Sequence, residues 1–355
     1  MRVLVCPTAF KESLTAGQVT DAVAEGVRRG LPSAAIRAMP VSDGGPGLLD
    51  SILAAESGEI RMSRVSGPLG SPVEARSLWV SPSTVVIETA DACGLHLVPS
   101  ASRDPMRADT RGVGELVAAC LEQGATEIAM GLGGSATVDG GTGLARIFGY
   151  RFLDLDGADL PSGGGGLATL ARVAPGPPLA AGVVVTAIAD VRAPLAGPDG
   201  AARRFGPQKG ASSRQVETLE AGLVRLADRL REDLGRDVAD LPGAGASGGL
   251  GAGCAAFVGA YLVTGSDWVL DRLDFERALA GADLVVTGEG AWDATSSMGK
   301  ITGEILRRSR LADVPALLVC GRASGPAPPG VGVVGGSGAW LGPRDLTRLV
   351  AEAVG

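Results

Sequence analysis

The chain has 355 residues, of which 45% are hydrophobic, and its formal net charge is −7 at pH 7. This length is enough for roughly two domains, each with its own buried core. The acidic balance and the lack of a long basic run exclude the clustered lysines and arginines that nucleic acid requires, so we expect no nucleic-acid partner. No stretch reaches the ~18 consecutive apolar residues of a membrane span, so we expect no membrane partner.

The cysteine and histidine content narrows the chemistry. The five cysteines are scattered and form no CxxC pair, which is typical of reduced thiols in a cytoplasmic protein and not of a disulfide framework or a zinc site. The single histidine, His96, fits an ordinary loop position, so catalysis by a Ser-His-Asp or Cys-His arrangement has little support. The first six residues form a strand pattern that is too short for a signal peptide.

The first sixty residues predict the start of a doubly wound α/β sheet. Strand patterns at 3–6 and 36–41 are each followed by a helical pattern. Open α/β sheets bind ligands at the carboxyl ends of their strands. Lys11 follows the first strand as a cation, and the acid and glycine turn Asp43-Gly44-Gly45 follows the second, although Asp43 fits an ordinary helix N-cap equally well.

From about residue 60 the pattern changes to short strands at 61–65, 73–80 and 85–88 without helices between them. We therefore expect a second domain to be inserted here. A helix at 116–121 follows, and Arg111 lies just before it, where its guanidinium group could bind a carboxylate or a phosphate.

The glycine-rich stretch at 131–143 is where we expect the active centre. It follows the apolar run at 128–130 and reads as a strand that ends in an anion-binding loop before a helix near 143–147. Its glycines allow close approach to a ligand, while Ser135 and Thr137 could donate to phosphate or bind Mg²⁺, and Asp139 could hold the metal. A tight structural turn between strand and helix is the alternative interpretation.

Two later loops add charged side chains. A strand at 183–189 carries Asp190 at its end, and the motif Phe205-Gly206-Pro207-Gln208-Lys209-Gly210 supplies an amide and an ammonium group. A helical pattern at 216–234 follows, with its charges on a solvated face.

The stretch at 242–251 formally contains GxGxxG, the dinucleotide fingerprint, so an oxidoreductase is an alternative. No strong strand precedes it, and the fingerprint normally lies in a first βα turn. Close packing of small residues against the following helix, expected at 252–263, explains several of these glycines.

The chain then returns to the doubly wound pattern. We expect a strand at 283–287, a loop at 288–293, a helix that ends near 308, and strands at 316–320 and 332–334. The first domain is therefore built from both chain ends, with predicted boundaries of 1–60 and 250–355, and the inserted domain spans 61–249.

Nine motifs in unbroken order over about residues 1–310 resemble the bacterial type I glycerate kinases. They are Phe10-Lys11-Glu12-Ser13-Leu14, Asp43-Gly44-Gly45, Gly112-Val113-Gly114-Glu115-Leu116, Gly133-Gly134-Ser135-Ala136-Thr137, Asp139-Gly140-Gly141, Asp190-Val191, Phe205-Gly206-Pro207-Gln208-Lys209-Gly210-Ala211, Pro242-Gly243-Ala244-Gly245 and Thr287-Gly288-Glu289-Gly290.

The resemblance implies ATP-dependent phosphorylation of glycerate to 2-phosphoglycerate, with ATP and Mg²⁺ as cofactors. It also implies two α/β domains: a flavodoxin-like (Rossmann-like) parallel-sheet domain, interrupted by a mixed α/β domain that carries the glycine-rich phosphate loop, with the reactants in the cleft between them. A kinase of another small hydroxy acid and a non-catalytic binding paralogue are the alternatives, and a homodimer is left open.

Five positions depart from the family pattern. Thr8, Pro46, Val138, Ala193 and Thr295 stand where the family usually has polar side chains. A site that hydrogen-bonds a substrate hydroxyl loses discrimination when such partners are lost, so an altered acceptor is an open alternative. The stretch after about Cys320 also matches the family poorly.

Roles follow for the retained residues, because phosphoryl transfer depends on positioning and charge neutralisation. We expect the acceptor to be bound by Lys11, Arg111, Gly44 and Gly45, and Asp139 and Asp293 to hold the metal. ATP is expected to contact Gly133, Gly134, Ser135, Thr137, Lys209, Glu289 and Lys300.

The acceptor hydroxyl needs a general base, and with one histidine in the chain a carboxylate is expected. Asp43 and Asp190 remain once the other acids are given metal, nucleotide or capping roles. We favour Asp190, which a rigid strand would hold, with Asp43 orienting the acceptor; Lys11 completes the predicted catalytic set.

Overall fold

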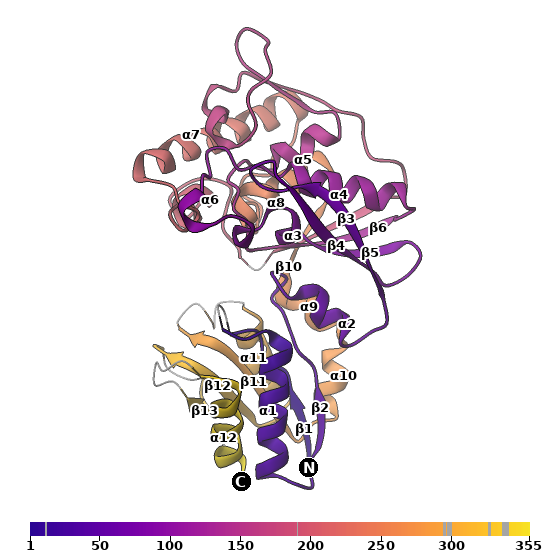
Figure 1. Ribbon diagram of the computed structural model, residues 1–355, viewed down its shortest axis with the longest axis vertical. Helices are drawn as coiled ribbons and strands as arrows, with labels where there is room; N and C mark the ends of the chain where they lie inside the picture. Colours follow the sequence, from indigo (N-terminus) through magenta and orange to yellow (C-terminus); the bar gives the residue numbers. More distant parts are fainter. Residues whose placement is uncertain (11–12, 190, 294–295, 297–299, 326–327, 336–340) are drawn as a thin grey trace. The chain divides into compact units, whose positions relative to one another are not determined.

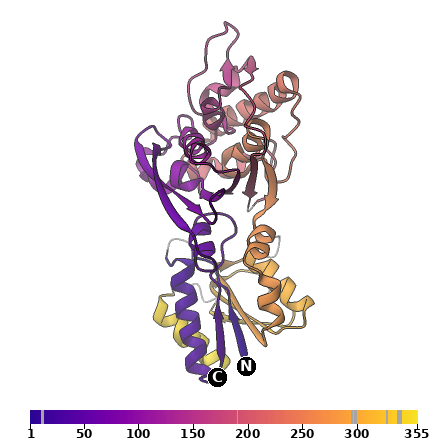
Figure 2. The ribbon, with the colours of Figure 1, turned by 90° about the vertical axis from the view of Figure 1, so that its right-hand side faces the viewer.

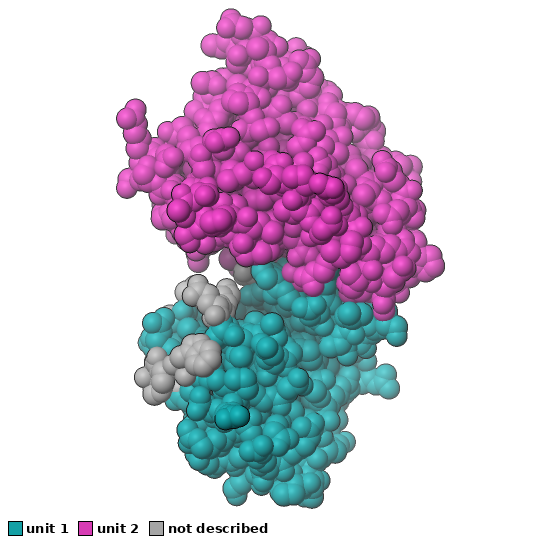
Figure 3. Space-filling view, in the orientation of Figure 1, with its two compact units in different colours: residues 1–57, 265–355 teal, residues 58–264 magenta. Residues whose placement is uncertain are grey.

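The computed structural model describes the chain except for residues 11–12, 190, 294–295, 297–299, 326–327 and 336–340. The described residues form two compact units, which are described separately: unit 1 comprises Met1–Ser57 and Gly265–Gly355, and unit 2 comprises Gly58–Thr264 (Figure 3). Within these residues, none of the helices combines the length and the hydropathy that crossing a lipid bilayer needs.

Unit 1 contains a parallel sheet of five strands that come from both ends of the chain (Figures 1 and 2). The spatial order β2-β1-β11-β12-β13 is the flavodoxin-like 2-1-3-4-5 order, so this part of the predicted fold class is confirmed. Its strands are β1 (Arg2–Val5), β2 (Ala35–Ala38), β11 (Leu284–Trp292), β12 (Ala316–Ala323) and β13 (Val331–Gly335). Its helices are α1 (Ala16–Gly30), α2 (Leu48–Leu53), α9 (Gly265–Arg272), α10 (Phe275–Ala280), α11 (Ile301–Leu311) and α12 (Pro343–Val354).

Alternating side chains of the strands of unit 1 fill two hydrophobic clusters. On β12, Val319 packs in the cluster shared with α1 and α12, whereas Leu318 and Cys320 pack with Trp292 and with Leu306 of α11. This is the period of two that a strand with both faces buried requires. Helix α1 begins with a capping box, in which the Thr15 hydroxyl accepts from the backbone N–H of Gln18.

Unit 2 contains a mixed sheet in the order β10-β9-β6-β5-β4-β3, with β3 and β4 antiparallel to their neighbours. Its strands are β3 (Glu59–Ser66), β4 (Pro72–Trp79), β5 (Thr84–Glu88), β6 (Glu127–Leu132), β9 (Val184–Ala189) and β10 (Tyr261–Thr264), and β7 (Arg151–Leu153) and β8 (Arg172–Ala174) form a separate pair. Its α-helices are α3 (Ala90–Cys93), α4 (Arg111–Glu122), α5 (Thr142–Ile147), α6 (Ala201–Phe205), α7 (Ser213–Leu234) and α8 (Ala246–Phe257).

Four local predictions differ from the structure. Strand β11 runs to Trp292 and not to residue 287, because residues 288–292 pair with β12 and Trp292 is buried there. Helix α8 ends at Phe257, since Gly259 has a positive φ of 65°, and the remainder of the predicted helix pairs with β9 as β10. The composition of the serine and glycine run at 162–166 predicts a flexible connector, whereas in the structure this run leads into the 3₁₀ helix η3 (Gly164–Thr169). Helix α12 was not predicted at all.

The division into units also differs from the predicted boundaries at its second junction. In the structure the units divide after Ser57 and after Thr264, whereas the predicted boundaries lie after residues 60 and 249. The difference arises because most of α8 lies beyond residue 249. Its Leu250, Cys254 and Phe257 belong to the hydrophobic core of unit 2.

Candidate active site

The central glycine loop of unit 2 follows β6 and is fixed at its sides by backbone hydrogen bonds. The N–H of Leu95 donates to the carbonyl of Gly134 at 2.7 Å, and the N–H of Ala136 donates to the carbonyl of Cys93 at 2.8 Å. Gly134 is exposed and has a φ of 63°, a left-handed conformation that favours glycine. The loop therefore presents its backbone at Gly134 while Ser135 and Thr137 point inward and are buried.

The structure brings the predicted phosphate-binding residues Ser135, Thr137 and Lys209 together. The ammonium group of Lys209 donates to the Ser135 Oγ at 2.9 Å and to the Thr137 carbonyl at 2.7 Å. Lys209 ends the 3₁₀ helix η4 (Pro207–Lys209) and is only 3% exposed. Burial lowers its pKa to about 8, against a partial opposing effect of the nearby Cys93 and Asp139. We call these three residues the Lys209 cluster.

Asp139 is fully buried, and its carboxylate accepts several hydrogen bonds. It accepts from the N–H and the hydroxyl of Thr110 at 2.9 and 2.8 Å, from the N–H of Gly141 at 3.2 Å and from the N–H of Gly143 at 3.0 Å. Burial, with the charge of Asp109, raises its pKa despite these bonds. This geometry suits an anchor between the loop and the start of α4 better than a metal ligand, and the metal role stays a prediction.

The stretch at 242–251 packs directly on the central loop. The N–H of Gly140 donates to the Gly248 carbonyl at 3.1 Å, and the Thr137 hydroxyl donates to the Ser247 carbonyl at 3.4 Å. Ser247, Gly248 and Gly249 are consecutively left-handed, with φ of 51, 72 and 91°. No strand directly precedes this stretch in the described chain, so its glycines serve close packing and not a dinucleotide-binding βα turn.

In unit 1, ligand-competent side chains gather at the carboxyl end of the sheet. In the 2-1-3-4-5 order the direction of the connections reverses between β1 and β11, and α/β sheets bind ligands at such a point. There the N–H and the hydroxyl of Thr8 donate to the Gly288 carbonyl at 2.8 and 3.1 Å, which joins the two strand ends. The next residue of β11 is Glu289.

Glu289 is partly buried among charged and polar groups of unit 1. Its pKa is raised to about 7, chiefly by burial and also by the charges of Asp293 and Asp43, while a hydrogen bond with Ser296 and the charge of Lys300 oppose the rise. Its Oε1 is buried and has no hydrogen-bond partner among the described residues. The structure thus places three predicted site residues, Glu289, Asp293 and Lys300, in one electrostatic neighbourhood.

The Asp43 loop is shaped by its own side chains. The N–H of Gly45 donates to Asp43 Oδ1 at 3.3 Å, and the Ser42 hydroxyl donates to the Gly45 carbonyl at 3.2 Å. Gly44 has a φ of 93°, which this tight turn requires. Asp43 is not the N-cap of α2, a position that Gly47 occupies.

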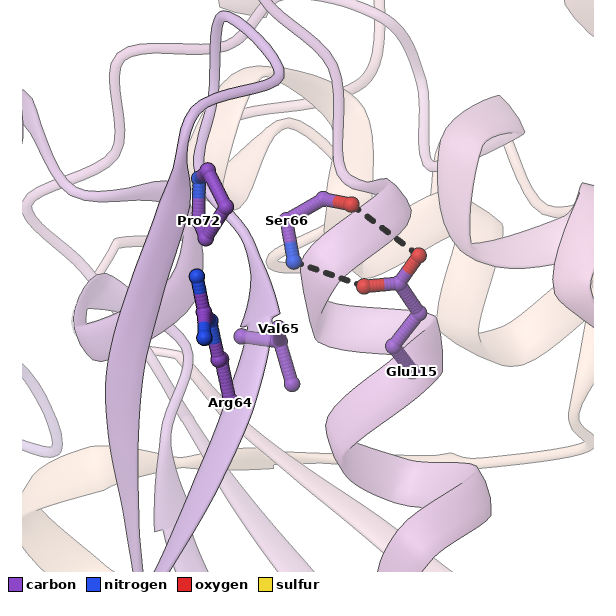
Figure 4. A pocket seen from close by; sticks show the side chains of 5 residues that line it. All are labelled: Arg64, Val65, Ser66, Pro72 and Glu115. Atoms are coloured by element: carbon purple, nitrogen blue, oxygen red, sulfur yellow. Dashed lines mark hydrogen bonds between the residues drawn. The ribbon is translucent and has the colours of Figure 1, made fainter.

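Arg111 is engaged by a carboxylate on its own helix. Its Nε donates to Glu115 Oε1 at 3.0 Å, and Glu115 also accepts from the N–H and hydroxyl of Ser66 at 2.6 and 3.0 Å. Figure 4 shows Glu115 and Ser66 on the wall of a cavity of about 270 Å³, which Arg64, Val65 and Pro72 also line. The guanidinium group lies beside this cavity wall and is half exposed.

Not every predicted site residue can be placed. Lys11, Asp190 and Thr295 lie outside the described residues. Val138 and Ala193 are buried in unit 2, so their apolar side chains fill its interior. In the part of the chain that the structure describes, no group of three or more histidine, cysteine, aspartate or glutamate side chains is arranged to hold a metal ion.

Sequence reasoning missed Thr110, Ser247 and Ser296. A hydroxyl at the head of a helix was the only signal for Thr110, and nothing local links it to Asp139. Ser247 lies inside a glycine run, and only its strained backbone and the buried Oγ, which finds no partner among the described residues, distinguish it.

Comparisons with known proteins agree on one family. The sequence profile described as the glycerate kinase family matches residues 3–330. A glycerate kinase of Halalkalibacterium halodurans is 41% identical over 90% of this chain and 85% of its own, and a glycerate 2-kinase of Escherichia coli K12 is 40% identical over 90% and 85%. A solved structure described as a glycerate kinase 2 from Salmonella typhimurium LT2 superposes with a TM-score of 0.82 at 36% identity, covering 100% of this chain and 96% of that one.

Proposed function

The chain belongs to the glycerate kinase family, and on that premise we propose that it transfers the γ-phosphoryl group of ATP to the 2-hydroxyl of glycerate, giving 2-phosphoglycerate and ADP. The E. coli relative described as a glycerate 2-kinase supports the choice of hydroxyl. Phosphoryl transfer needs little covalent chemistry from the protein, which has to position the reactants and neutralise the charge that develops on the phosphates.

The Lys209 cluster is the observation that carries the proposal. An ammonium group in an apolar interior costs free energy unless something repays it, and anionic phosphate at the loop supplies that compensation. Lys209 already holds Ser135 and Thr137 in place, and the backbone, half-buried at Gly133 and exposed at Gly134, leaves room for a ligand. We assign ATP phosphates to this loop and a nucleotide contact of unit 1 to Lys300.

For the acceptor we retain Lys11, Arg111, Gly44 and Gly45, since glycerate carries a carboxylate that needs a cation or a group of N–H donors. Asp43 orients the acceptor in this scheme. Arg111 has to share its guanidinium group with Glu115, so Lys11 is the stronger of the two cationic candidates.

Mg²⁺ fits the donor chemistry of unit 1. Magnesium is usually held by one or two carboxylates together with phosphate oxygens, and Asp293 offers such a carboxylate in unit 1. The ion would neutralise charge on the transferring phosphates. We also infer a cytoplasmic enzyme, which is supported by five cysteines that are all free and buried.

The function is tested by measuring ADP release from purified protein with ATP, Mg²⁺ and glycerate, and by identifying the phosphorylated carbon with ³¹P NMR. We expect turnover with glycerate and a 2-phosphate product. A panel of other small hydroxy acids covers the alternative acceptor that the family departures raise. Turnover with another acid alone would change the substrate, and no turnover with any acid, despite ATP binding, would favour a binding protein. Reduction of NAD or NADP would instead indicate the oxidoreductase.

A further inference from the structure

Glu289 has an unusual position for a glutamate, because it lies inside a parallel strand of the sheet and not in a loop. It pairs in register with Cys320 of β12 and is flanked by Gly288 and Gly290. Most buried polar atoms in folded proteins have a hydrogen-bond partner, and exceptions call for an explanation such as a catalytic role. The buried Oε1 of Glu289 is such an exception within the described residues.

The position of Glu289 in the sheet is consistent with a catalytic role for this oxygen. Glu289 follows the backbone link between Thr8 and Gly288, so it lies at the carboxyl end of β1 and beside it, where the strand order reverses. This is where an open α/β sheet places its ligand. A carboxylate on a strand is also held more rigidly than one on a loop, which suits a group that has to accept a proton at a fixed point.

The surrounding groups make this carboxylate basic at neutral pH. The described groups that act on it are Asp43 from the loop before α2, Asp293 and Ser296 after β11, Lys300 at the start of α11, and Cys320 on β12, whose own pKa Glu289 raises. Burial outweighs the attraction of Lys300, and the pKa of Glu289 is about 7. A general base works best when its pKa lies near the operating pH.

We propose that Glu289 is the general base of the reaction and accepts the proton of the acceptor hydroxyl. The inference rests on the proposed function. In the transfer step the O–H bond of the acceptor breaks and its proton moves to the Glu289 carboxylate. The acceptor oxygen then forms a bond to the γ-phosphorus, and the bond to the bridging oxygen breaks, so that ADP leaves with the electron pair.

This assignment differs from the sequence-based preference for Asp190, with Asp43 as second choice, and it replaces the nucleotide contact that the sequence predicts for Glu289. Asp43 lies in a turn, where its Oδ1 accepts a hydrogen bond from the N–H of Gly45, whereas Glu289 lies on a strand. Asp190 lies outside the described residues and is therefore tested directly by mutation.

The test compares Glu289→Gln with wild-type protein over pH 5.5 to 9, with initial rates measured at varied acceptor and ATP concentrations. We expect kcat to fall at least about 10²-fold, with the KM for ATP within about 3-fold of wild type, the scale of a lost general base. The wild-type kcat/KM should decrease below pH ~7 as Glu289 becomes protonated, and this decrease should be absent from the residual activity of the variant. A purely structural role would leave the acidic decrease in place.

Two further variants serve as controls. Glu220→Gln exchanges another buried glutamate that also has an oxygen without a partner among the described residues, in unit 2, and should keep kcat within about 2-fold. Asp190→Asn should retain the acidic decrease. Thermal unfolding of all three variants separates a catalytic loss from misfolding.

The following results would overturn the proposal. Glu289 is not the base if Glu289→Gln keeps more than half of kcat, or if Asp190→Asn alone removes the acidic decrease. If Glu289→Gln unfolds, Glu289→Asp decides, because a base displaced by one methylene should keep the acidic decrease at reduced kcat. If wild-type protein phosphorylates no acid in the panel, the proposed function fails and the assignment fails with it. If wild-type protein phosphorylates a different acid from the panel, the same variants are compared with that acid as the acceptor.

Discussion

Lys209 combines burial with two hydrogen bonds to a loop that we assign to phosphate, so its charge state should control nucleotide affinity. Because burial lowers its pKa to about 8, the ammonium group is present below that pH and is lost above it. We predict that Lys209→Met raises the KM for ATP at pH 7 by about 10-fold or more. In wild-type protein the KM for ATP should begin to rise above pH ~8, and this rise should be missing in the variant.

The measurement is initial-rate kinetics at varied ATP concentration between pH 6.5 and 9.5. The KM for glycerate, measured in parallel, should change much less. Equal changes in both constants, or an alkaline rise that persists without Lys209, would place the lysine elsewhere in the reaction.

Gly134 tests whether the loop binds a ligand or is only a turn. A β-branched side chain is strongly disfavoured at its φ of 63°, and the residue is exposed where the phosphates are expected. Gly134→Val should therefore reduce kcat/KM for ATP by at least about 10-fold. Gly124→Val is a matched control, because Gly124 also has a positive φ, of 99°, and nothing lies within 4 Å of its added Cβ.

Both variants introduce similar backbone strain, so they should lower the melting temperature by similar amounts. Only Gly134→Val should impair turnover. If the two variants are equally active, the loop is a structural turn and the phosphates bind elsewhere.

The central loop and the start of α8 pack closely against each other, and glycines at the contact make this possible. A Cβ at Gly248 would overlap the Thr137 carbonyl and lie 2.9 Å from the Val138 Cα, and its φ of 72° is unfavourable for alanine. We predict that Gly248→Ala destabilises the protein by about 2–4 kcal/mol, from overpacking and backbone strain together. It should also weaken ATP binding, because Thr137 belongs to the Lys209 cluster.

Urea denaturation measures the stability change. Gly235→Ala is the control, since Gly235 ends α7 with a φ of 64° and has open space around the added Cβ. A Gly248→Ala variant no less stable than Gly235→Ala would contradict this close packing.

The elements themselves show which features the sequence reveals. Hydrophobic spacing is a local signal, and it placed the two strands on either side of α1 to within a few residues. Strand β11 was cut short because two glycines within it are typical of loops, and only pairing with β12, which the local pattern does not contain, makes them a strand.

The site was predictable as a set of loops but not as a set of contacts. Glycine-rich motifs predicted Ser135, Thr137 and Lys209 as phosphate ligands, and the structure brings these three together, which leaves the ligand role itself a prediction. The partner of Asp139 is Thr110, and this pairing follows from how α4 packs on α5, which has no local signature. That Glu289 Oε1 is buried and finds no partner among the described residues likewise depends on tertiary burial and could not be inferred from the residue types around it.

At the scale of the whole molecule, unit 2 is continuous in sequence and has its own hydrophobic core. We predict that residues 58–264 expressed alone fold with a cooperative thermal transition. This fragment should bind ATP weakly and should release no ADP, because Glu289, Lys300 and Asp43 belong to unit 1. Circular dichroism and the ADP assay test both statements, and full-length protein is the reference. A fragment that remains unfolded, or one that releases ADP, would contradict the prediction that unit 2 folds and binds ATP alone but needs unit 1 for catalysis.

The pairing of β1 with β11 also has a consequence for biosynthesis. Val3 lies opposite Leu284, so the first strand leaves the ribosome long before β11 has been made. At about 5–20 residues per second, the rest of the chain takes on the order of 15–60 s to follow. During that interval the apolar face of α1, with Val19, Val23 and Val27, is not yet covered by β11 and by the C-terminal helix α12 that pack on it. We expect unit 2 to fold first on the ribosome, and the nascent N-terminal segment to be the part of this protein that depends most on chaperones.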